Sequence, residues 1–415
     1  MCSSDLEGGR LLPFFLCTLN IEPVDLDVVR KGWQRVLRAR LEDARFFWEA
    51  DLASGFTPWL AALEHVVFMG PLGSMADKAR RLARLCALLA AECNLSRAEA
   101  AQVERAGLLA NADLVSEMVG EFDTLQGIMG GIYARRQGED EAVARAVAEQ
   151  YLPAGPDSPV PATLAGALVS LADKADNLAG CFGLDMIPTG AADPYALRRQ
   201  ALGICRILIE HGLRLSPGRL LALAQEGYGA AAAWKLPPAE ARKRFEEFLA
   251  QRLRAYFTGL GHSTLVADSA LGAGAADVRA LSARVRALSD FSREPDFGQA
   301  VLTFKRAANI VRKQGEEANV PLTGAFDPAL FEADEERELA ARLAEAAPRF
   351  EALWARDDFP GLLGLLRELR PVVDAFFDHV MVICDDLKLR ANRLNLLKAL
   401  ADMLGRLAYF NLMQV

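Results

Sequence analysis

The chain has 415 residues, 52% of them hydrophobic and 25% charged, with a formal net charge of −8 at pH 7. A chain of this length and composition is globular and can bury cores large enough for two or three domains. Its charge excludes a protein that is basic overall, so any binding of nucleic acid must be local. The sequence shows no apolar run near the roughly 20 residues of a membrane span and no signal-peptide pattern, so we expect a cytoplasmic protein without a membrane partner.

The first predicted element is a strand over Leu11 to Ile21, an apolar and aromatic segment bounded by Gly-Gly and Glu-Pro pairs. From Val28 onward the apolar residues follow the period of a helix. A further helix is expected over Met75 to Glu92, with Ser74 as its N-cap. Its basic side chains face either phosphates or solvent, and they are Lys78, Arg80, Arg81 and Arg84.

Composition also marks the segments between helices. Pro153 to Pro161 reads as a proline-rich loop inside a helical domain, and the Gly/Ala-rich Ser269 to Asp277 as a turn or hinge. The acidic run Glu332 to Glu338 is expected to open a helix, where negative charge complements the helix dipole. Seven scattered cysteines without a CxxC pair favour reduced, buried thiols over a disulfide framework or a zinc site.

The stretch Ala110 to Gly131 lies on a helical pattern where a metal hydrolase would place a His-Asp pair, but it offers Asn-Ala-Asp ending at Asp113. The segment VSLADKADNLAG, which contains Asp173, likewise resembles a helix of the HD-type phosphohydrolases. Neither segment contains the histidine that would help a carboxylate to hold a divalent metal. We therefore expect no metal site, with Asp113 and Asp173 capping or hydrogen-bonding neighbouring helices, and residual metal binding near His65 as the alternative.

Asp193-Pro194 predicts a helix start, with Asp193 as the N-cap and proline in the first helical position. Arg198 and Arg199 follow one turn later and splay by about 100° because they are adjacent, so at most one is easily buried. Contact with RNA or a partner subunit and a surface salt bridge are the alternatives for the other.

Two basic helical segments lie near the C-terminus. Thr303 to Lys313 contains no acidic residue, and Lys305 and Arg312 are seven residues apart, as are Arg306 and Lys313. This spacing predicts one helix face that presents four positive charges.

In the second segment, a leucine stripe from Leu394 to Leu407 leaves Arg390, Arg393 and Lys398 beside or opposite it. A helical bundle with a basic rim and a leucine core suits the reading of an anticodon, because single-stranded bases splay out and phosphates are held by charge. Generic amphipathic helices would give the same pattern.

Taken together, these segments make the chain similar to the β subunit of the bacterial two-subunit glycyl-tRNA synthetases, from about Gly9 to Val415. The start looks truncated, so the chain resembles the C-terminal part of such a subunit. The blocks that carry the resemblance are RVLRARLEDARFFWEADL, EMVGEFDTLQGIMGGIYA, LADKADNLAGCFGLDMIPTGAADPYALRRQALG, TFKRAANIVRK and LRANRLNLL.

The resemblance implies a mainly α fold in three parts. Residues 1–27 would be the remnant of a preceding β-containing domain, residues 28–270 an HD-like all-α domain with degenerate ligands, and residues 271–415 a DALR-type anticodon-binding helical bundle. The RNA contacts would be Lys305, Arg306, Arg312, Lys313, Arg390 and Arg393.

The implied function is that of the β subunit of glycine-tRNA ligase, which binds tRNA-Gly and an α subunit, in a heterotetramer, and does not bind DNA. The chain has no Gly-rich phosphate loop, so we expect no catalytic residue and no cofactor of its own. ATP and Mg²⁺ would act through the α subunit, and the chain alone would be inactive. The alternatives are an HD-type metal-dependent phosphohydrolase and a stand-alone RNA-binding or scaffold protein.

Overall fold

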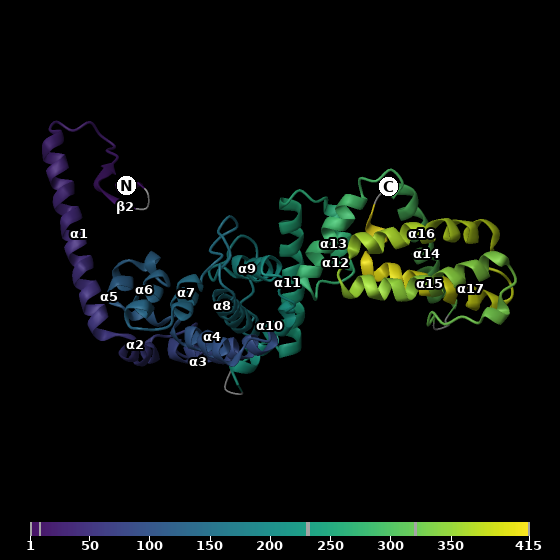
Figure 1. Ribbon diagram of the computed structural model, residues 1–415, viewed down its shortest axis with the longest axis horizontal. Coiled ribbons are helices and arrows are strands. Elements are labelled where there is room, and N and C mark those ends of the chain that lie inside the picture. Colours follow the sequence, from purple (N-terminus) through teal and green to yellow (C-terminus); the bar gives the residue numbers. More distant parts are fainter. Residues whose placement is uncertain (1, 8–9, 230–232, 319–321, 414–415) are drawn as a thin grey trace.

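The structure is a computed structural model that describes residues 2–7, 10–229, 233–318 and 322–413, with side chains described over 14–229, 233–314 and 322–413. It is elongated, with the N-terminal hairpin at one end and the last helices at the other (Figure 1). The described elements are mainly α-helical, which confirms the predicted fold class. Among them, no helix is long and apolar enough to cross a membrane.

At the N-terminal end, strands β1 (Cys2–Glu7) and β2 (Arg10–Cys17) pair in antiparallel register. The predicted strand is therefore confirmed, although it ends at Cys17, and its partner β1 was not predicted. Helix α1 (Leu26–Ser54) follows and extends away from the helices behind it (Figure 1). It is fastened at its far end by Asp51, whose carboxylate accepts hydrogen bonds from the amides of Glu117 and Met118 and from the Tyr133 hydroxyl.

The middle region is a stack of helices around one buried helix, α8 (Leu164–Gly183), in which every residue from Gly166 to Gly183 is buried. Helices α3, α4, α7, α9, α10 and α11 pack around it. Its many small residues let these neighbours approach closely. The other helices of this region are α2 (Phe56–Ala62), α3 (Met75–Glu92), α4 (Arg97–Leu109), α5 (Glu117–Glu121), α6 (Ile128–Arg136), α7 (Glu141–Glu149), α9 (Leu197–Glu210), α10 (Pro217–Gly227) and α11 (Pro238–Gly259).

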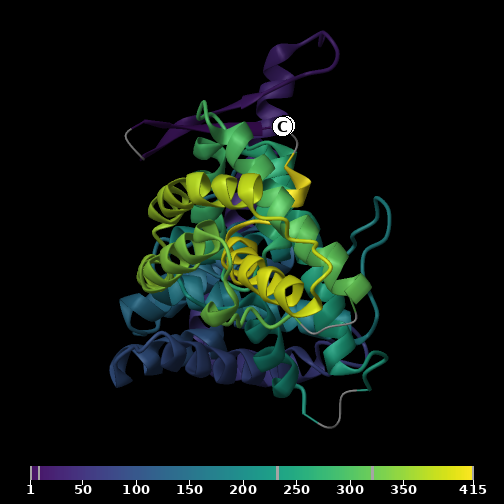
Figure 2. The same cartoon turned by 90° about the vertical axis from the view of Figure 1, so that its right-hand side faces the viewer.

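The C-terminal region is a helical bundle in which α14 packs on α17 and α16, and α15 packs on α16 and α17. Figure 2 views the molecule from the end that carries these green and yellow helices. Helix α13 contacts both α9 and α16, and one apolar cluster runs from Phe56 to Met413, so the two regions share a continuous core. The helices are α12 (Thr264–Gly272), α13 (Val278–Phe291), α14 (Phe297–Ala318), α15 (Asp334–Ala355), α16 (Phe359–His379) and α17 (Leu387–Leu407).

Several local predictions are confirmed at the ends of helices. Ser74 caps α3 and forms a capping box with Asp77, and the acidic run opens α15. The predicted start of α9 is wrong by a few residues: the helix begins at Leu197, not after Asp193. Asp193 still serves as a cap, because its carboxylate accepts from the Leu197 and Arg198 amides at 2.8 and 3.0 Å.

The predicted domain boundary at residue 270 falls in the last turn of α12, ahead of the turn that leads to α13. Short 3-10 turns complete the fold at Leu63–His65, Ala112–Val115, Asp123–Leu125, Pro328–Leu330 and Phe410–Leu412.

Candidate nucleic-acid interface

Asp113, the first carboxylate of the hydrolase-like pattern, caps a helix. Its side chain is fully buried, and Oδ2 accepts hydrogen bonds from the amides of Gly127 and Gly130 at 2.6 and 2.8 Å, at the start of α6. A Cβ at Gly130 would lie 2.9 Å from the same oxygen, so this contact depends on glycine. Burial raises the pKa of Asp113 to about 6, although the two amides pull it down. The predicted capping role is confirmed for Asp113.

Asp173, the second carboxylate, is held by a lysine. Lys78 Nζ lies 2.7 Å from Asp173 Oδ1 and donates to Asn177 Oδ1 at 2.6 Å. Asn177 in turn donates to Asp173 and to Gln200. An ammonium group thus provides the positive charge that a metal ion would supply in a hydrolase. The predicted hydrogen-bonding role is confirmed for Asp173.

A second buried ion pair lies beside the first. Arg81 donates to both oxygens of Asp176, at 2.7 and 3.0 Å, and its guanidinium stacks 3.9 Å from the centre of the Tyr228 ring. Lys78 and Arg81 therefore face neither phosphates nor solvent, and both predicted alternatives are wrong for these two side chains, which are at most 9% exposed. The spacing could not reveal this, because the partner carboxylates are on α8, about a hundred residues later in the chain.

Metal ligands are not gathered elsewhere in the described ranges. These contain no group of three or more His, Cys, Asp or Glu side chains placed to hold a metal ion. His65 lies exposed in its 3-10 turn, away from a ligand set of this kind. The described cysteines Cys86, Cys93, Cys181, Cys205 and Cys384 are free thiols, and burial raises the pKa of Cys86, Cys181 and Cys205.

The cationic face of α14 is the part of the predicted site that lies at the surface. Arg306, Arg312 and Lys313 are exposed and Lys305 is half-buried. The side chains described in the structure include no carboxylate within 4.0 Å of any of these four groups. Arg306 lies over the Phe377 ring at 4.3 Å, which joins the charged face to α16. Among the described side chains, this face of α14 is therefore cationic, in a chain whose net charge is −8.

A hollow of about 440 Å³ adjoins this face between α14 and the segment that follows α16. Its lining combines Arg306, Phe377, Asp378 and His379 with Ile310 and the apolar segment Val380 to Ile383. Met381 is 74% exposed and Ile383 is 42% exposed. Apolar side chains next to arginine form the kind of surface on which a nucleic-acid base stacks. We did not predict this hollow; its sequence signal is an apolar run placed directly after a helix.

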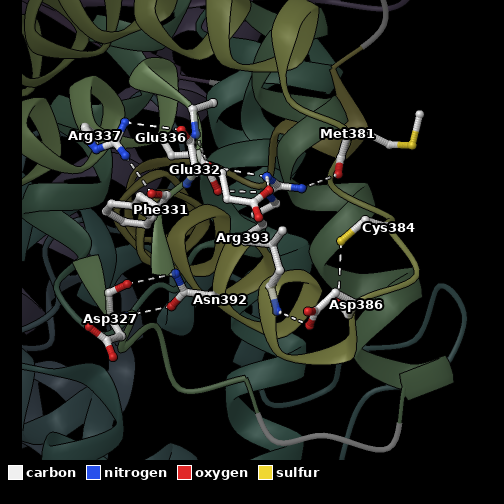
Figure 3. Close-up of polar contacts among 12 residues, drawn as sticks. Asp327, Phe331, Glu332, Glu336, Arg337, Met381, Cys384, Asp386, Asn392 and Arg393 are labelled. Atoms are coloured by element: carbon white, nitrogen blue, oxygen red, sulfur yellow. Dashed lines mark hydrogen bonds and ion pairs between the residues drawn. The ribbon is translucent and has the colours of Figure 1, made fainter. Parts of the chain in front are cut away.

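Arg393 is a correction to the predicted RNA contacts. The side chain is buried, and its guanidinium donates to Glu336 Oε1 at 2.8 Å and to the Met381 carbonyl at 3.1 Å (Figure 3). Glu336 has no exposed surface, and it also accepts from the amides of Glu332 and Ala333. Burial pushes the pKa of Glu336 upward, but Arg393 and the two amides outweigh it, so this pKa lies below its usual value. Arg393 therefore fastens α17 to the start of α15 and does not reach a ligand.

Two asparagines of α17 hold the segment before α15. Asn392 accepts from the Asp327 amide at 2.7 Å and donates to the Asp327 carbonyl at 3.0 Å (Figure 3). Asn395 accepts from the amides of Thr323 and Gly324. The LRANRLNLL block is thus largely structural. Arg390, by contrast, is half-buried at the start of α17, and no acidic side chain of the described residues lies within 4.0 Å of it.

Comparison with known proteins places the chain in a family. The model of the "Glycyl-tRNA synthetase beta subunit" matches residues 3–272, and that of the "DALR anticodon binding domain" matches residues 301–410. The glycine-tRNA ligase beta subunit of Nitratidesulfovibrio vulgaris strain Miyazaki F is 65% identical over the whole chain, which covers 60% of that protein. Those of Lawsonia intracellularis and Desulforudis audaxviator are 46% and 41% identical over 98% and 96% of the chain, which covers 58% and 57% of them. The chain thus spans less than two thirds of the length of these curated relatives, and it belongs to the glycyl-tRNA synthetase beta subunit family.

Proposed function

We propose that this chain acts as part of a glycine-tRNA ligase, in which its C-terminal helices bind tRNA-Gly. One observation carries the proposal. The residues matched by the anticodon-binding model include the exposed cations of α14, which have no acidic partner among the described side chains. Phosphates of a bound RNA would neutralise these cations, and the adjoining apolar hollow offers a surface for unstacked bases.

The RNA-binding face that we propose consists of Lys305, Arg306, Arg312, Lys313 and Arg390. Lys305 and Arg312 lie seven residues apart on α14 and therefore point to one side of the helix, as do Arg306 and Lys313. Arg393 is left out because it is buried and paired with Glu336.

The partner that this function requires is the α subunit of the ligase. In our proposal that subunit uses ATP and Mg²⁺ to form the glycyl-adenylate, while this chain presents tRNA-Gly to it in the cytoplasm, in a heterotetramer. The names of the relatives, which are beta subunits of glycine-tRNA ligase, support this division of labour. The chain itself contributes binding surfaces and no reacting group.

The experiment that tests the proposal removes two charges from α14. Replacing Lys305 and Arg312 together by alanine should weaken tRNA-Gly binding by about 1–3 kcal/mol and flatten its salt dependence by up to about two units of slope. The measurement is filter binding at several salt concentrations, with thermal melts of the same samples. The melting temperature should barely change, because Arg312 is exposed, Lys305 is only half-buried, and truncation of surface side chains costs little.

A matched control removes two charges from another helix of the same bundle. Arg342 and Arg349 on α15 are both exposed and paired with carboxylates, so their alanine variant changes the net charge equally. This variant should bind tRNA-Gly like the wild type. Equal affinity and salt slope in the Lys305/Arg312 variant would refute the proposed face.

The enzymatic part of the proposal is tested by adding the α subunit from one of the relatives' organisms. Glycyl-tRNA should form only when both subunits, ATP and Mg²⁺ are present, and less of it with the Lys305/Arg312 variant at limiting tRNA. Formation of glycyl-tRNA by this chain without the α subunit would contradict the division of labour. Phosphate release from nucleotides by this chain alone would favour the phosphohydrolase alternative.

A further inference from the structure

A second cationic hollow lies in the middle region, far from α14 in the sequence. It holds about 680 Å³, within the usual range of ligand pockets of roughly 300–1,000 Å³. Helices α9 and α11, which pack against each other (Figure 1), form two of its walls, and the proline-rich loop Pro153 to Pro161 contributes a third. This loop was recognised in the sequence, but the anticodon-binding function does not use it.

The charge of this hollow is positive. Its lining contains the arginines Arg198, Arg199, Arg206 and Arg252 and one acidic residue, Asp157. Arg206 is paired with Glu210 at 3.1 Å. For the other three arginines, the part of the chain with described side chains has no carboxylate within 4.0 Å.

The hydrogen bonds of these arginines divide them into two pairs. Arg198 and Arg206 are held by backbone carbonyls, whereas Arg199 and Arg252, the free pair, make one hydrogen bond each. Arg206 donates to the carbonyls of Pro156 and Ser158 at 2.8 Å each, and Arg198 donates to that of Gly190 at 2.6 Å. Arg206 therefore holds the proline-rich loop against α9, and Arg198 holds the segment that precedes α9. Arg199 is exposed and makes one long contact, 3.2 Å to the Ala154 carbonyl.

Arg252 completes the free pair from the opposite wall. Its guanidinium lies over the Phe248 ring, 5.3 Å from the ring centre, and makes one hydrogen bond, 3.2 Å to Gln251. Its Nε is shielded from solvent without a hydrogen-bond partner among the described atoms. A shielded N–H without an acceptor is costly, and a ligand that brings an acceptor would remove this cost. An anionic oxygen satisfies both the charge and the missing hydrogen bond.

The rest of the lining is apolar and includes one aromatic ring. Leu202, Ala255 and Leu260 also line the hollow, and Tyr256 is half-buried, with part of its surface open. A hollow for inorganic phosphate alone would not require this apolar surface. A flat base next to Tyr256, with its phosphate near Arg199 and Arg252, matches both parts of the lining.

We infer that the hollow between α9, α11 and the proline-rich loop binds a phosphorylated nucleotide, with Arg199 and Arg252 on the phosphate and Tyr256 against the base. The nucleotide belongs either to an RNA strand or to the free pool, and both sources share this chemistry. The inference adds a second binding site to the one proposed on α14 and does not depend on that site.

The test uses the whole chain and a fluorescent single-stranded RNA of eight nucleotides with mixed sequence. Replacing Arg199 and Arg252 by alanine should weaken binding about tenfold and lower the salt slope by about 1.4, since each contact with a single strand contributes about 0.7. Tyr256→Leu keeps an apolar side chain without the ring and should weaken binding at least about fivefold. The control is alanine at Arg242 and Lys243, two exposed cations of the same helix, and it should bind like the wild type.

Competition with AMP separates the two sources. Displacement of the RNA by millimolar AMP identifies a site that also takes free nucleotides, whereas displacement by longer RNA alone identifies a nucleotide within a strand. If melting shows that the double variant is unfolded, Arg199→Glu at the exposed position replaces it and should weaken RNA binding at least as strongly.

The variants of the two sites are compared in the same assay. If the Arg199/Arg252 variant binds the eight-nucleotide RNA as tightly as the wild type, this inference is overturned. That holds even if the Lys305/Arg312 variant loses tRNA-Gly binding and so supports the face on α14. If instead the Arg199/Arg252 variant loses RNA binding and the Lys305/Arg312 variant keeps its affinity for tRNA-Gly, the face on α14 is overturned and the second hollow is supported.

Discussion

Replacing Arg393 by alanine tests the reassignment of this residue from RNA contact to structural support. In the fold its side chain is 8% exposed, and that of its partner Glu336 is 0% exposed. The substitution would leave the Glu336 carboxylate buried without its cation and would free the Met381 carbonyl. The bundle should therefore lose stability where α15 and α17 meet.

The expected magnitude follows from what remains around Glu336. Removing one partner of a buried ion pair costs about 3–5 kcal/mol, because the other charge is left uncompensated. Glu336 would keep the hydrogen bonds from the amides of Glu332 and Ala333, at 2.9 and 2.8 Å, so we expect a loss near about 3 kcal/mol. Removing both charges with Glu336→Gln and Arg393→Met should cost less, since no buried charge is then left alone.

Urea unfolding measures the loss, and hydrogen exchange locates it at the start of α15 and in the segment held by α17. Arg342→Ala is the control, because its partners Glu338 and Glu345 are exposed and such pairs contribute about 0–1 kcal/mol. Unchanged unfolding and exchange in Arg393→Ala, together with weaker tRNA binding, would refute the reasoning and return Arg393 to the RNA-binding face.

Three further predictions concern two capping carboxylates, Asp113 and Asp77, and the hydrolase-like site. Burial raises the pKa of Asp113 from 3.8 to about 6, so the folded state binds more protons than the unfolded state. The free energy of unfolding of the wild type should therefore fall by up to about 3 kcal/mol, relative to that of Asp113→Asn, as the pH rises from about 4 to 7. Urea midpoints across this range check this prediction, and a difference that does not depend on pH would contradict it. Asp77 should show the opposite sign, because the Ser74 amide and Arg80 lower its pKa to about 2, so the fold loses stability as the pH falls. The purified chain should release no phosphate from nucleotides with Mn²⁺, Mg²⁺ or Zn²⁺, and sustained release that disappears in Asp113→Ala would show that the site is active.

Local features of this protein could be predicted from its sequence because neighbouring residues produce them. Ser74 and Asp77 are three residues apart and form the capping box of α3 within a single turn. The helical period and the acidic run that opens α15 also arise from residues that are close together in the sequence. The α14 face also follows from spacing alone, since residues seven apart on a helix point the same way in any tertiary context.

Tertiary structure decided which charged residues are buried and which remain available for ligands. Lys78, Arg81 and Arg393 look in the sequence like the exposed cations around them, but their carboxylates lie 57 to 95 residues away and reach them only through the packing of helices. The hollow between α9 and α11 likewise brings Arg199 and Arg252 together from distant segments. The periodicity of a helix fixes which side chains share a face, whereas the charge and burial of each face depend on the helix that packs against it.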